Sequence, residues 1–454
     1  MTPWTWPVKR ASGTEVPRRL KRCPTWRGAN YVAIDYLTMR ANFKMRLCLW
    51  ALAGLPLVAA NVKPESVGLS EERLARVHDA IQRHIDAHDF SGAVTLVARK
   101  GQIAWFDAQG LMDVEANKPM QKGATFRVFS MSKPVCGAAI LMLLEEGKVR
   151  LNDPVSKFIP EFKGSKVAIV QDRPANAPAS DPPRYYTIPA TREITIQDLL
   201  THVSGLASGG PASTHELPGL IDMVGSRTLA DMMPKFAAAP LDFQPGSRWT
   251  YSALAGFDTL GRVVEVASGM SFDQFLKQRI FTPLGMKSTA FHPGDDRWPT
   301  VVTAYHRGGG SLTKTQGPNR LQSKSYFSGA GGLVSTAEEY AQFALMLCAG
   351  GKWNGNQLLS PKTVELMSSV FVPDTLPGRA PGRGYGLSVE VVSDPVAAGR
   401  RVSKGSFGWD GAYGTHFWVD PKEKLIGVMM IQTDNPDRQA DRDFENAVMQ
   451  AIVE

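Results

Sequence analysis

Apolar residues recur at helical spacing in the first stretch of the chain that has a regular pattern. The residues that share one helical face there are Leu74, Val77, Ile81 and Ile85. Ser70 precedes them where a side-chain oxygen can cap a helix, and two glutamates follow it in the first turn. The pattern predicts an amphipathic helix that begins just after Ser70.

Apolar runs of strand length follow near both ends of the patterned region. Residues 93–98 and 103–108 are joined through a Lys-Gly turn, which is a hairpin signal. Residues 417–419 and 425–432 flank a charged turn, and a final helix comes after them. The apolar face of that helix carries Phe444, Val448 and Ile452. About 200 helix-rich residues separate the two ends. We therefore expect a sheet closed by both ends of the domain around a helical insertion.

The charge of the chain is concentrated in its first 60 residues. Of 51 basic and 43 acidic residues, ten basic and two acidic ones lie there, which leaves 41 of each in residues 61–454. The formal net charge of +8 therefore belongs to the leader and not to a binding surface. This distribution argues against a nucleic-acid partner.

The leader has the layout of a secretory signal. Basic residues precede the apolar run 47–55, and small residues end it at Ala60. We predict cleavage before Asn61 and a periplasmic or secreted protein without a stable membrane partner; an uncleaved anchor is the alternative. Because about forty residues without periodicity precede the signal, translation is expected to begin at Met39 or Met45.

The cysteines show no metal-binding spacing. Cys23 and Cys48 fall in the leader, so Cys136 and Cys348 remain in the mature part. Both lie in apolar helical contexts and are predicted to be free, buried thiols. We expect neither a metal nor a cofactor.

The strongest chemical signal is Ser130 with Lys133, placed before an apolar helical run. Ser and Lys three residues apart share a helical face, and a lysine there accepts the serine proton if burial and positive potential favour its neutral form. Alone, the pattern is weak, and a helix cap is the other reading of Ser130. A second copy, Ser311 to Lys314, lies among glycines, and we interpret it as a flexible loop without a catalytic role.

Two companion segments make the assignment specific. Residues 249–253, Trp-Thr-Tyr-Ser-Ala, precede a helix at 254–268, and residues 407–412, Phe-Gly-Trp-Asp-Gly-Ala, begin a strand-rich stretch. With Ser130 and Lys133 they resemble the serine β-lactamase and penicillin-binding-protein superfamily, in particular the class C β-lactamase-related branch that includes the family VIII carboxylesterases. Further matching segments are 199–206, 283–286 and 328–336. The resemblance covers about residues 65–450.

The resemblance implies an α+β fold of the β-lactamase/transpeptidase type. In such a fold an antiparallel sheet is flanked by helices and carries an inserted helical domain. Residues 61–454 then form one catalytic domain, with a sheet part at about 65–125 and 300–454 and a helical part at about 126–299.

The resemblance also implies the roles of individual residues. Ser130 is the expected nucleophile and Lys133 the acceptor of its proton. Tyr251 is expected to share the general-base role and to protonate the leaving group. The expected oxyanion hole consists of the backbone N–H groups of Ser130 and Ala412, and losing one such donor typically costs about 10²–10³ in rate.

Two departures from the family pattern bear on the substrate. The third motif usually begins with Lys or His, which faces a lactam carboxylate, and here it begins with Trp409 while Gly411 is retained. The second motif usually ends in Asn, and here it ends in Ala253. Trp409 and Gly411 are the predicted substrate-binding residues, and Lys404 is a candidate replacement cation. The departures favour a carboxylesterase acting on short-chain or small acyl esters.

Other functions remain open at this point. One is a β-lactamase or a D-amino-acid peptidase or amidase, and another is a non-catalytic binding module with the same fold. A degenerate module is expected to lack at least one of Ser130, Lys133 and Tyr251, and all three are present. His202 and His416 are predicted to be structural. The expected partner is a small ester or amide substrate.

Overall fold

The computed structural model describes residues 61–172, 182–219, 227–315 and 322–454. The leader and its predicted cleavage site before Asn61 therefore lie at or outside the edge of the described residues. The leader's Cys23 and Cys48 and the candidate starts Met39 and Met45 lie outside them as well.

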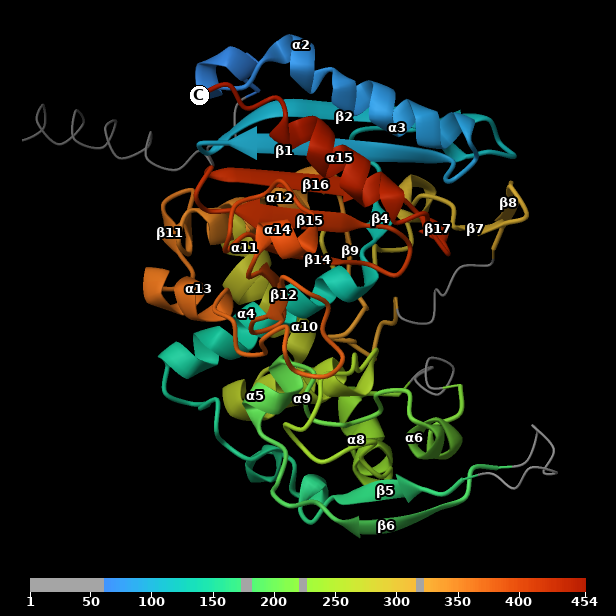
Figure 1. Cartoon of the computed structure of the whole chain (residues 1–454), viewed down its shortest axis with the longest axis vertical. Helices are drawn as coiled ribbons and strands as arrows, with labels where there is room; N and C mark the ends of the chain where they lie inside the picture. The colour runs from blue at the N-terminus through green and yellow to red at the C-terminus, as the bar shows by residue number, and fades with distance from the viewer. Residues whose placement is uncertain (1–60, 173–181, 220–226, 316–321) are drawn as a thin grey trace, which may run out of the picture. The chain divides into compact units, whose positions relative to one another are not determined.

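The main sheet of the described part has eight strands, all antiparallel to their neighbours. In spatial order these are β12 (Arg383–Tyr385), β13 (Glu390–Val392), β14 (Phe407–Asp410), β15 (His416–Asp420), β16 (Leu425–Met430), β1 (Gly92–Arg99), β2 (Gln102–Asp113) and β3 (Lys118–Pro119). The C-terminal β16 pairs with the N-terminal β1, so the sheet is closed by both ends of the domain (Figure 1). The predicted fold class is confirmed.

Helices cover both faces of this sheet, which explains why every residue of β1 is buried. On one face lie α2 (Glu71–Leu74), α3 (Arg76–Asp86) and α15 (Gln439–Met449); on the other lies α12 (Ala337–Cys348). Ser70 caps α2 by accepting a hydrogen bond from the backbone N–H of Arg73, as the sequence predicts. The predicted single helix is interrupted at Ala75, where α2 ends and α3 begins.

The β1–β2 hairpin turns at Lys100 and Gly101, with φ angles of 53° and 79°. Two successive left-handed residues make the turn whose twist matches the flanking strands, so this predicted hairpin forms for the expected reason.

The helical part is built around α4 (Ser132–Glu145), in which every residue from Ser132 to Leu143 is buried. Apart from the helices already named, the α-helices of the described part of the chain are α5 (Ile196–Leu200), α6 (Pro211–Glu216), α8 (Leu229–Ala238), α9 (Ala255–Ser268), α10 (Phe272–Leu276), α11 (Thr282–Leu284), α13 (Pro361–Met367) and α14 (Pro395–Ala398). Helix α9 packs against α4, α5, α8 and α10, and thus links the inserted helices to α4 (Figure 1).

Smaller strands complete the described part. These are β4 (Phe126–Arg127), β5 (Lys166–Val170), β6 (Tyr185–Pro189), β7 (Tyr305–Gly308), β8 (Ser311–Lys314), β9 (Val334–Ser335), β10 (Lys352–Trp353), β11 (Asn356–Gln357) and β17 (Thr433–Asp434). The prediction that Ser311 lies in a flexible loop is wrong, because β8 pairs with β7 and Lys314 forms an ion pair with Asp113.

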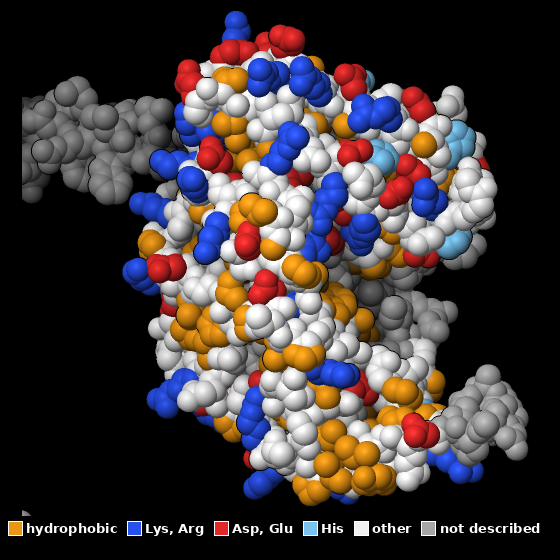
Figure 2. Space-filling model, in the orientation of Figure 1, with side chains coloured by type: hydrophobic (Ala, Val, Ile, Leu, Met, Phe, Trp, Pro, Cys, Tyr) orange, Lys and Arg blue, Asp and Glu red, His pale blue; other side chains and the backbone are white. Residues whose placement is uncertain are grey.

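Basic and acidic side chains are mixed on the visible surface, and the prediction of two buried, free thiols is confirmed only in part. Figure 2 shows Lys and Arg interspersed with Asp and Glu over the visible face. Cys136 and Cys348 are free, and Cys136 is fully buried, whereas Cys348 is only partly so. Among the described residues, none of the helices has the length and apolar character needed to cross a membrane.

Gly427 is a point where the sheet tolerates no side chain. It lies opposite Trp418, and a Cβ at this position would meet the indole ring at 2.1 Å. We predict that Gly427→Ala lowers the free energy of unfolding by about 2 kcal/mol or more, because the buried ring has no room to move. Gly123→Ala is the matched control, since nothing lies within 4 Å of its Cβ position. Equal denaturation midpoints for the two variants would contradict this account.

Candidate active site

Ser130 lies in a strained turn at the start of a buried helix. A 3₁₀ turn, Phe129–Met131, leads directly into α4. Phe129 has a φ of 45°, in the left-handed region that side chains rarely adopt, and its ring stacks on Tyr413 at 4.5 Å. Such a conformation persists only where the surroundings enforce it. The turn is thereby fixed, and the half-buried Ser130 lines a cavity of about 710 Å³.

Lys133 is completely buried beside Ser130. Its Nζ donates to the carbonyl oxygens of Ala253 at 2.8 Å and Ala330 at 2.9 Å, and it lies 3.3 Å from Ser130 Oγ. Because carbonyls only accept, they hold the amine in either protonation state. The remaining position around Nζ faces Ser130 Oγ. A protonated Lys133 donates a hydrogen bond to this oxygen, and a neutral Lys133 presents its lone pair to it. The geometry suits a proton acceptor for Ser130.

Tyr251 reaches the same hydroxyl from a different part of the chain. Its phenol oxygen donates to Ser130 Oγ at 2.6 Å, and its ring centroid lies 4.8 Å from Lys133 Nζ. The structure therefore brings together the three residues that the sequence predicts to be catalytic.

His202 holds the backbone on both sides of Tyr251. The N–H of Thr250 donates to the carbonyl of His202 at 3.1 Å, and the N–H of Ser252 donates to its Nδ1 at 3.1 Å. Burial holds the pKa of His202 well below its usual value, and the positive charge of Lys133 adds to this. A neutral ring that accepts at Nδ1 is what the contact with Ser252 requires.

A buried carboxylate that the sequence analysis missed positions the backbone at Ala330, whose carbonyl accepts a hydrogen bond from Lys133. Asp258 on α9 accepts from Tyr326 Oη at 2.5 Å, from Ser328 Oγ at 2.7 Å and from the N–H of Ala330 at 3.1 Å. Burial raises the pKa of Asp258 to about 6, although these hydrogen bonds act in the opposite direction. The available signal was an acidic residue in the otherwise apolar start of α9.

The third motif borders the cavity through the turn that follows β14. Ala412 and Ser130 both line the cavity, so the two predicted oxyanion donors border the same space. Gly411 does not line it. A Cβ there would lie 2.0 Å from Thr415 Oγ1 and 2.6 Å from the carbonyl of Val128. Gly411 therefore permits close packing beneath the turn.

Trp409 lies behind Tyr251. Its ring centroid is 5.6 Å from that of Tyr251, 5.1 Å from Tyr385 and 6.5 Å from His202. Neither Trp409 nor the exposed Lys404 is among the described residues that line the cavity. A direct contact between Trp409 and substrate stays a prediction, and the observed ring contacts of Trp409 are with Tyr251, Tyr385 and His202.

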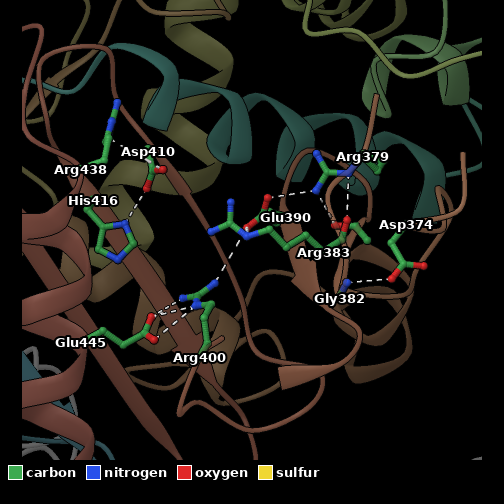
Figure 3. Close-up of polar contacts among 11 residues, drawn as sticks. Asp374, Arg379, Gly382, Arg383, Glu390, Arg400, Asp410, His416, Arg438 and Glu445 are labelled. Atoms are coloured by element: carbon green, nitrogen blue, oxygen red, sulfur yellow. Dashed lines mark hydrogen bonds and ion pairs between the residues drawn. The ribbon is translucent and has the colours of Figure 1, made fainter. Parts of the chain in front are cut away.

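One group of side chains has the spacing of a metal site, but its carboxylates are already paired with other side chains. Asp410, His416 and Asp441 each place a ligand atom within 4.8 Å of the others. His416 Nδ1 lies 2.5 Å from Asp410, and Arg438 lies 3.8 Å from Asp410 (Figure 3). Arg438 also lies 3.2 Å from Asp441. Burial opposes protonation of His416, but the Asp410 carboxylate outweighs it and raises the pKa of His416. The carboxylates already have cationic partners, so we assign no metal to this group.

Comparison with known proteins gives a consistent family assignment. The family model described as Beta-lactamase matches residues 77–450. An uncharacterized protein of Mycobacterium tuberculosis, MT1414, is 35% identical over 370 residues, covering 78% of this chain and 88% of that protein. Esterase EstB of Burkholderia gladioli is 30% identical over 401 residues, covering 83% and 95%.

A solved structure shares the fold over a similar range. EstCE1, described as a hydrolase with promiscuous acyltransferase activity, superposes with a TM-score of 0.69 at 27% identity. The match covers 83% of this chain and 99% of that chain.

Asp258 makes a testable contribution to the pH dependence of stability. Its folded pKa of about 6 lies above the ordinary value of 3.8, so the folded state binds the proton more tightly between these values. The contribution of this carboxyl to the unfolding free energy therefore falls as pH rises from about 4 to about 6 and then stays constant. We predict that the difference between the wild type and Asp258→Asn changes over this range and is flat above it. Denaturant titrations from pH 4 to 8 measure this, with the exposed Asp79→Asn as control; a flat difference throughout would refute the role of Asp258.

Proposed function

The chain belongs to the Beta-lactamase family, and from that premise we propose that it is a carboxylesterase that cleaves small, uncharged acyl esters through an acyl-enzyme on Ser130. The family places the protein among the serine hydrolases. The proposal concerns the choice of substrate within that superfamily and the residues that carry the reaction.

The character of the Ser130 cavity carries the proposal. Its described lining contains no Lys, Arg, Asp or Glu, and its polar side chains are hydroxyls. Leu217, Leu254 and Phe129 give it apolar walls, and Lys133 is buried beneath it, away from solvent. A carboxylate that enters such a space loses its hydration without gaining an ion pair, whereas a neutral acyl chain gains apolar contact. The cavity thus favours uncharged esters.

Acylation follows from the contacts around Ser130 Oγ. As this oxygen attacks the ester carbonyl carbon, its proton passes to the pair formed by the buried Lys133 and the half-buried Tyr251. The carbonyl oxygen becomes an oxyanion, for which the N–H groups of Ser130 and Ala412 are the proposed donors. Collapse of the intermediate breaks the bond to the alcohol oxygen, and Tyr251 supplies the proton that the alcohol takes away.

Deacylation repeats these transfers with water. A water molecule gives a proton to the same pair as its oxygen attacks the acyl carbon, and the bond to Ser130 Oγ breaks as the serine regains its proton. The acid product leaves the site as a carboxylate. The apolar lining favours its release, because the product is charged and the substrate is not.

Two related proteins support the choice of an ester. EstB is named an esterase, and EstCE1 is named a hydrolase with acyltransferase activity. The replacements at Trp409 and Ala253 point in the same direction, since both positions lack the polar groups that lactam-hydrolysing relatives are expected to carry.

Ser130→Ala is predicted to lower kcat for p-nitrophenyl butyrate by about 10⁴–10⁶, because no other side chain in the site forms the acyl-enzyme. Ser311→Ala tests the second Ser-x-x-Lys sequence and should leave turnover within about twofold, since Ser311 is exposed on β8. Mass spectrometry after treatment with a fluorophosphonate should find the adduct on the Ser130 peptide. An adduct on Ser311, or full activity of Ser130→Ala, would overturn the assignment of the nucleophile.

The preference for neutral substrates is predicted from the uncharged lining. The wild-type ratio of kcat/KM for p-nitrophenyl butyrate to that for the anionic lactam nitrocefin should exceed one. Thr214→Lys adds a cation at an exposed lining position on α6, and it should lower the ratio by up to about fivefold, the size expected for a solvent-exposed ion pair.

His215→Lys is the matched control, since His215 is the exposed neighbour of Thr214 and does not line the cavity. It should leave the ratio unchanged. A wild type that favours nitrocefin by tenfold or more would promote β-lactam hydrolysis over ester hydrolysis. Equal shifts in the two lysine variants would show that the lining charge does not set the preference.

A further inference from the structure

The two proposed oxyanion donors stand on turns that are far apart in the chain. Ser130 lies in the 3₁₀ turn Phe129–Met131, and Ala412 lies in the turn between β14 and β15. Both N–H groups have to point at one oxygen atom, because such donors act on the transition state only where its charge develops. The fold must therefore fix one turn against the other.

The turn that carries Ser130 is closed by the carbonyl of Val128. The N–H of Met131 donates to this carbonyl at 3.0 Å, and the bond spans Phe129 and Ser130. The position of the Val128 carbonyl is therefore coupled to that of the Ser130 N–H, two residues further along the chain.

The turn that carries Ala412 is closed by two backbone hydrogen bonds. The N–H of Gly411 donates to the carbonyl of Thr415 at 2.7 Å, and the N–H of Gly414 donates to the carbonyl of Gly411 at 3.1 Å. A peptide unit is planar, so holding the Gly411 carbonyl also sets the direction of the Ala412 N–H in the same unit. Among the described residues this N–H has no acceptor, which leaves it available to a ligand in the Ser130 cavity.

Thr415 connects the two turns. Its backbone carbonyl closes the turn of Ala412, and its hydroxyl donates to the Val128 carbonyl at 3.2 Å. The side chain is completely buried, and the hydroxyl has to be the donor because a carbonyl oxygen only accepts. Gly411 leaves room for this hydroxyl, since a Cβ there would lie 2.0 Å from Thr415 Oγ1. One residue thus holds backbone on both sides of the expected oxyanion.

A ring contact joins the same two turns but constrains them less. Phe129 stacks on Tyr413 with 4.5 Å between the ring centroids and 14° between the ring planes. The rings bring the turns together, whereas a hydrogen bond between a hydroxyl and the backbone prefers a narrow range of distance and angle. The Thr415 hydroxyl is therefore the contact that is suited to set the direction of the donors.

We propose that Thr415 is a positioning residue of the oxyanion hole, and that its hydroxyl fixes the Ser130 and Ala412 N–H groups relative to each other. This inference rests on the proposed function, because it presumes an acyl-enzyme on Ser130. Thr415 is not among the described residues that line the Ser130 cavity, so its effect reaches the reaction through the backbone.

Thr415→Val tests this role, because it replaces the hydroxyl with a methyl group of similar size and keeps the backbone carbonyl. We expect kcat for p-nitrophenyl butyrate to fall about 10- to 100-fold, somewhat less than for the loss of a whole donor. KM should stay within about twofold, because acylation and deacylation both pass through the oxyanion and the bound ester does not yet carry that charge. Thr415→Ser keeps the hydroxyl and should retain kcat within about threefold.

Thr259→Val is the matched control. Thr259 is also completely buried, and its hydroxyl donates to a carbonyl, that of Ala255 at 2.7 Å, but this bond lies within α9. Since a hydroxyl that bonds back to its own helix contributes little, this variant should leave kcat within about twofold.

A second measurement separates positioning from a loss of folded protein. Butaneboronic acid forms a tetrahedral, negatively charged adduct with a serine hydroxyl, so its inhibition constant should rise in Thr415→Val by about the factor by which kcat/KM falls. The final extent of fluorophosphonate labelling on Ser130, which counts folded sites, should equal that of the wild type. If Thr415→Val does not fold, Thr415→Ser and Thr415→Ala make the same comparison with smaller side chains, and kcat should be at least about fivefold higher for the serine variant.

The inference fails if Thr415→Val keeps the kcat of the wild type, if KM alone changes, or if the boronic acid inhibits both proteins equally. It also fails if Thr259→Val lowers kcat as much as Thr415→Val does, or if the serine and alanine variants have the same kcat. A wild type that forms no fluorophosphonate adduct on Ser130 would instead overturn the proposed function, and with it the premise of this inference.

Discussion

The complete burial of the Lys133 amine is the constraint on which the site depends. A buried amine must be hydrogen-bonded, and here its partners are Ser130 Oγ and the carbonyls of Ala253 and Ala330. Those partners come from three segments that are far apart in the chain. The fold therefore has to deliver two backbone carbonyls and one hydroxyl to a single point. Helix α4 supplies Lys133 from within the core, and the other segments must be held against it.

Two side chains outside the motifs do this holding. His202 uses its carbonyl and Nδ1 to fix the backbone on either side of Tyr251, just before Ala253. Asp258 fixes the segment that presents the Ala330 carbonyl. Each uses a buried polar group to position backbone. The Asp258 carboxylate accepts three hydrogen bonds, whereas Nε2 of His202 is buried without a partner among the described residues. The proton-transfer geometry at Ser130 thus rests on two side chains that are not among the described residues lining the Ser130 cavity.

The sequence predicts those parts of the structure that have local causes. The hairpin at Lys100 follows from turn chemistry, and the nearness of Ser130 and Lys133 follows from helical spacing. The strand at Ser311 was missed because its glycines indicate flexibility, whereas its pairing with β7 and the ion pair of Lys314 with Asp113 are tertiary. The role of Asp258 was missed for the same reason, since its partners lie about seventy residues away. Contacts of this kind leave only a weak trace in one sequence, such as an acid in an apolar helix.

Trp409 stands where the third motif of the family usually has Lys or His, and this replacement affects the surroundings of Tyr251. A cation at this position would lie among Tyr251, Tyr385 and His202, where burial is unfavourable to charge. The indole instead packs against Tyr251 on one side, which leaves the Ser130 cavity without a cation. Trp409 also lines a second cavity, of about 290 Å³, whose wall carries both arginines and carboxylates. The aromatic layer therefore separates an uncharged cavity from a charged one. A neutral ester therefore meets no charged side chain among the described residues that line the Ser130 cavity, although charged groups lie only a few side chains away behind Tyr251.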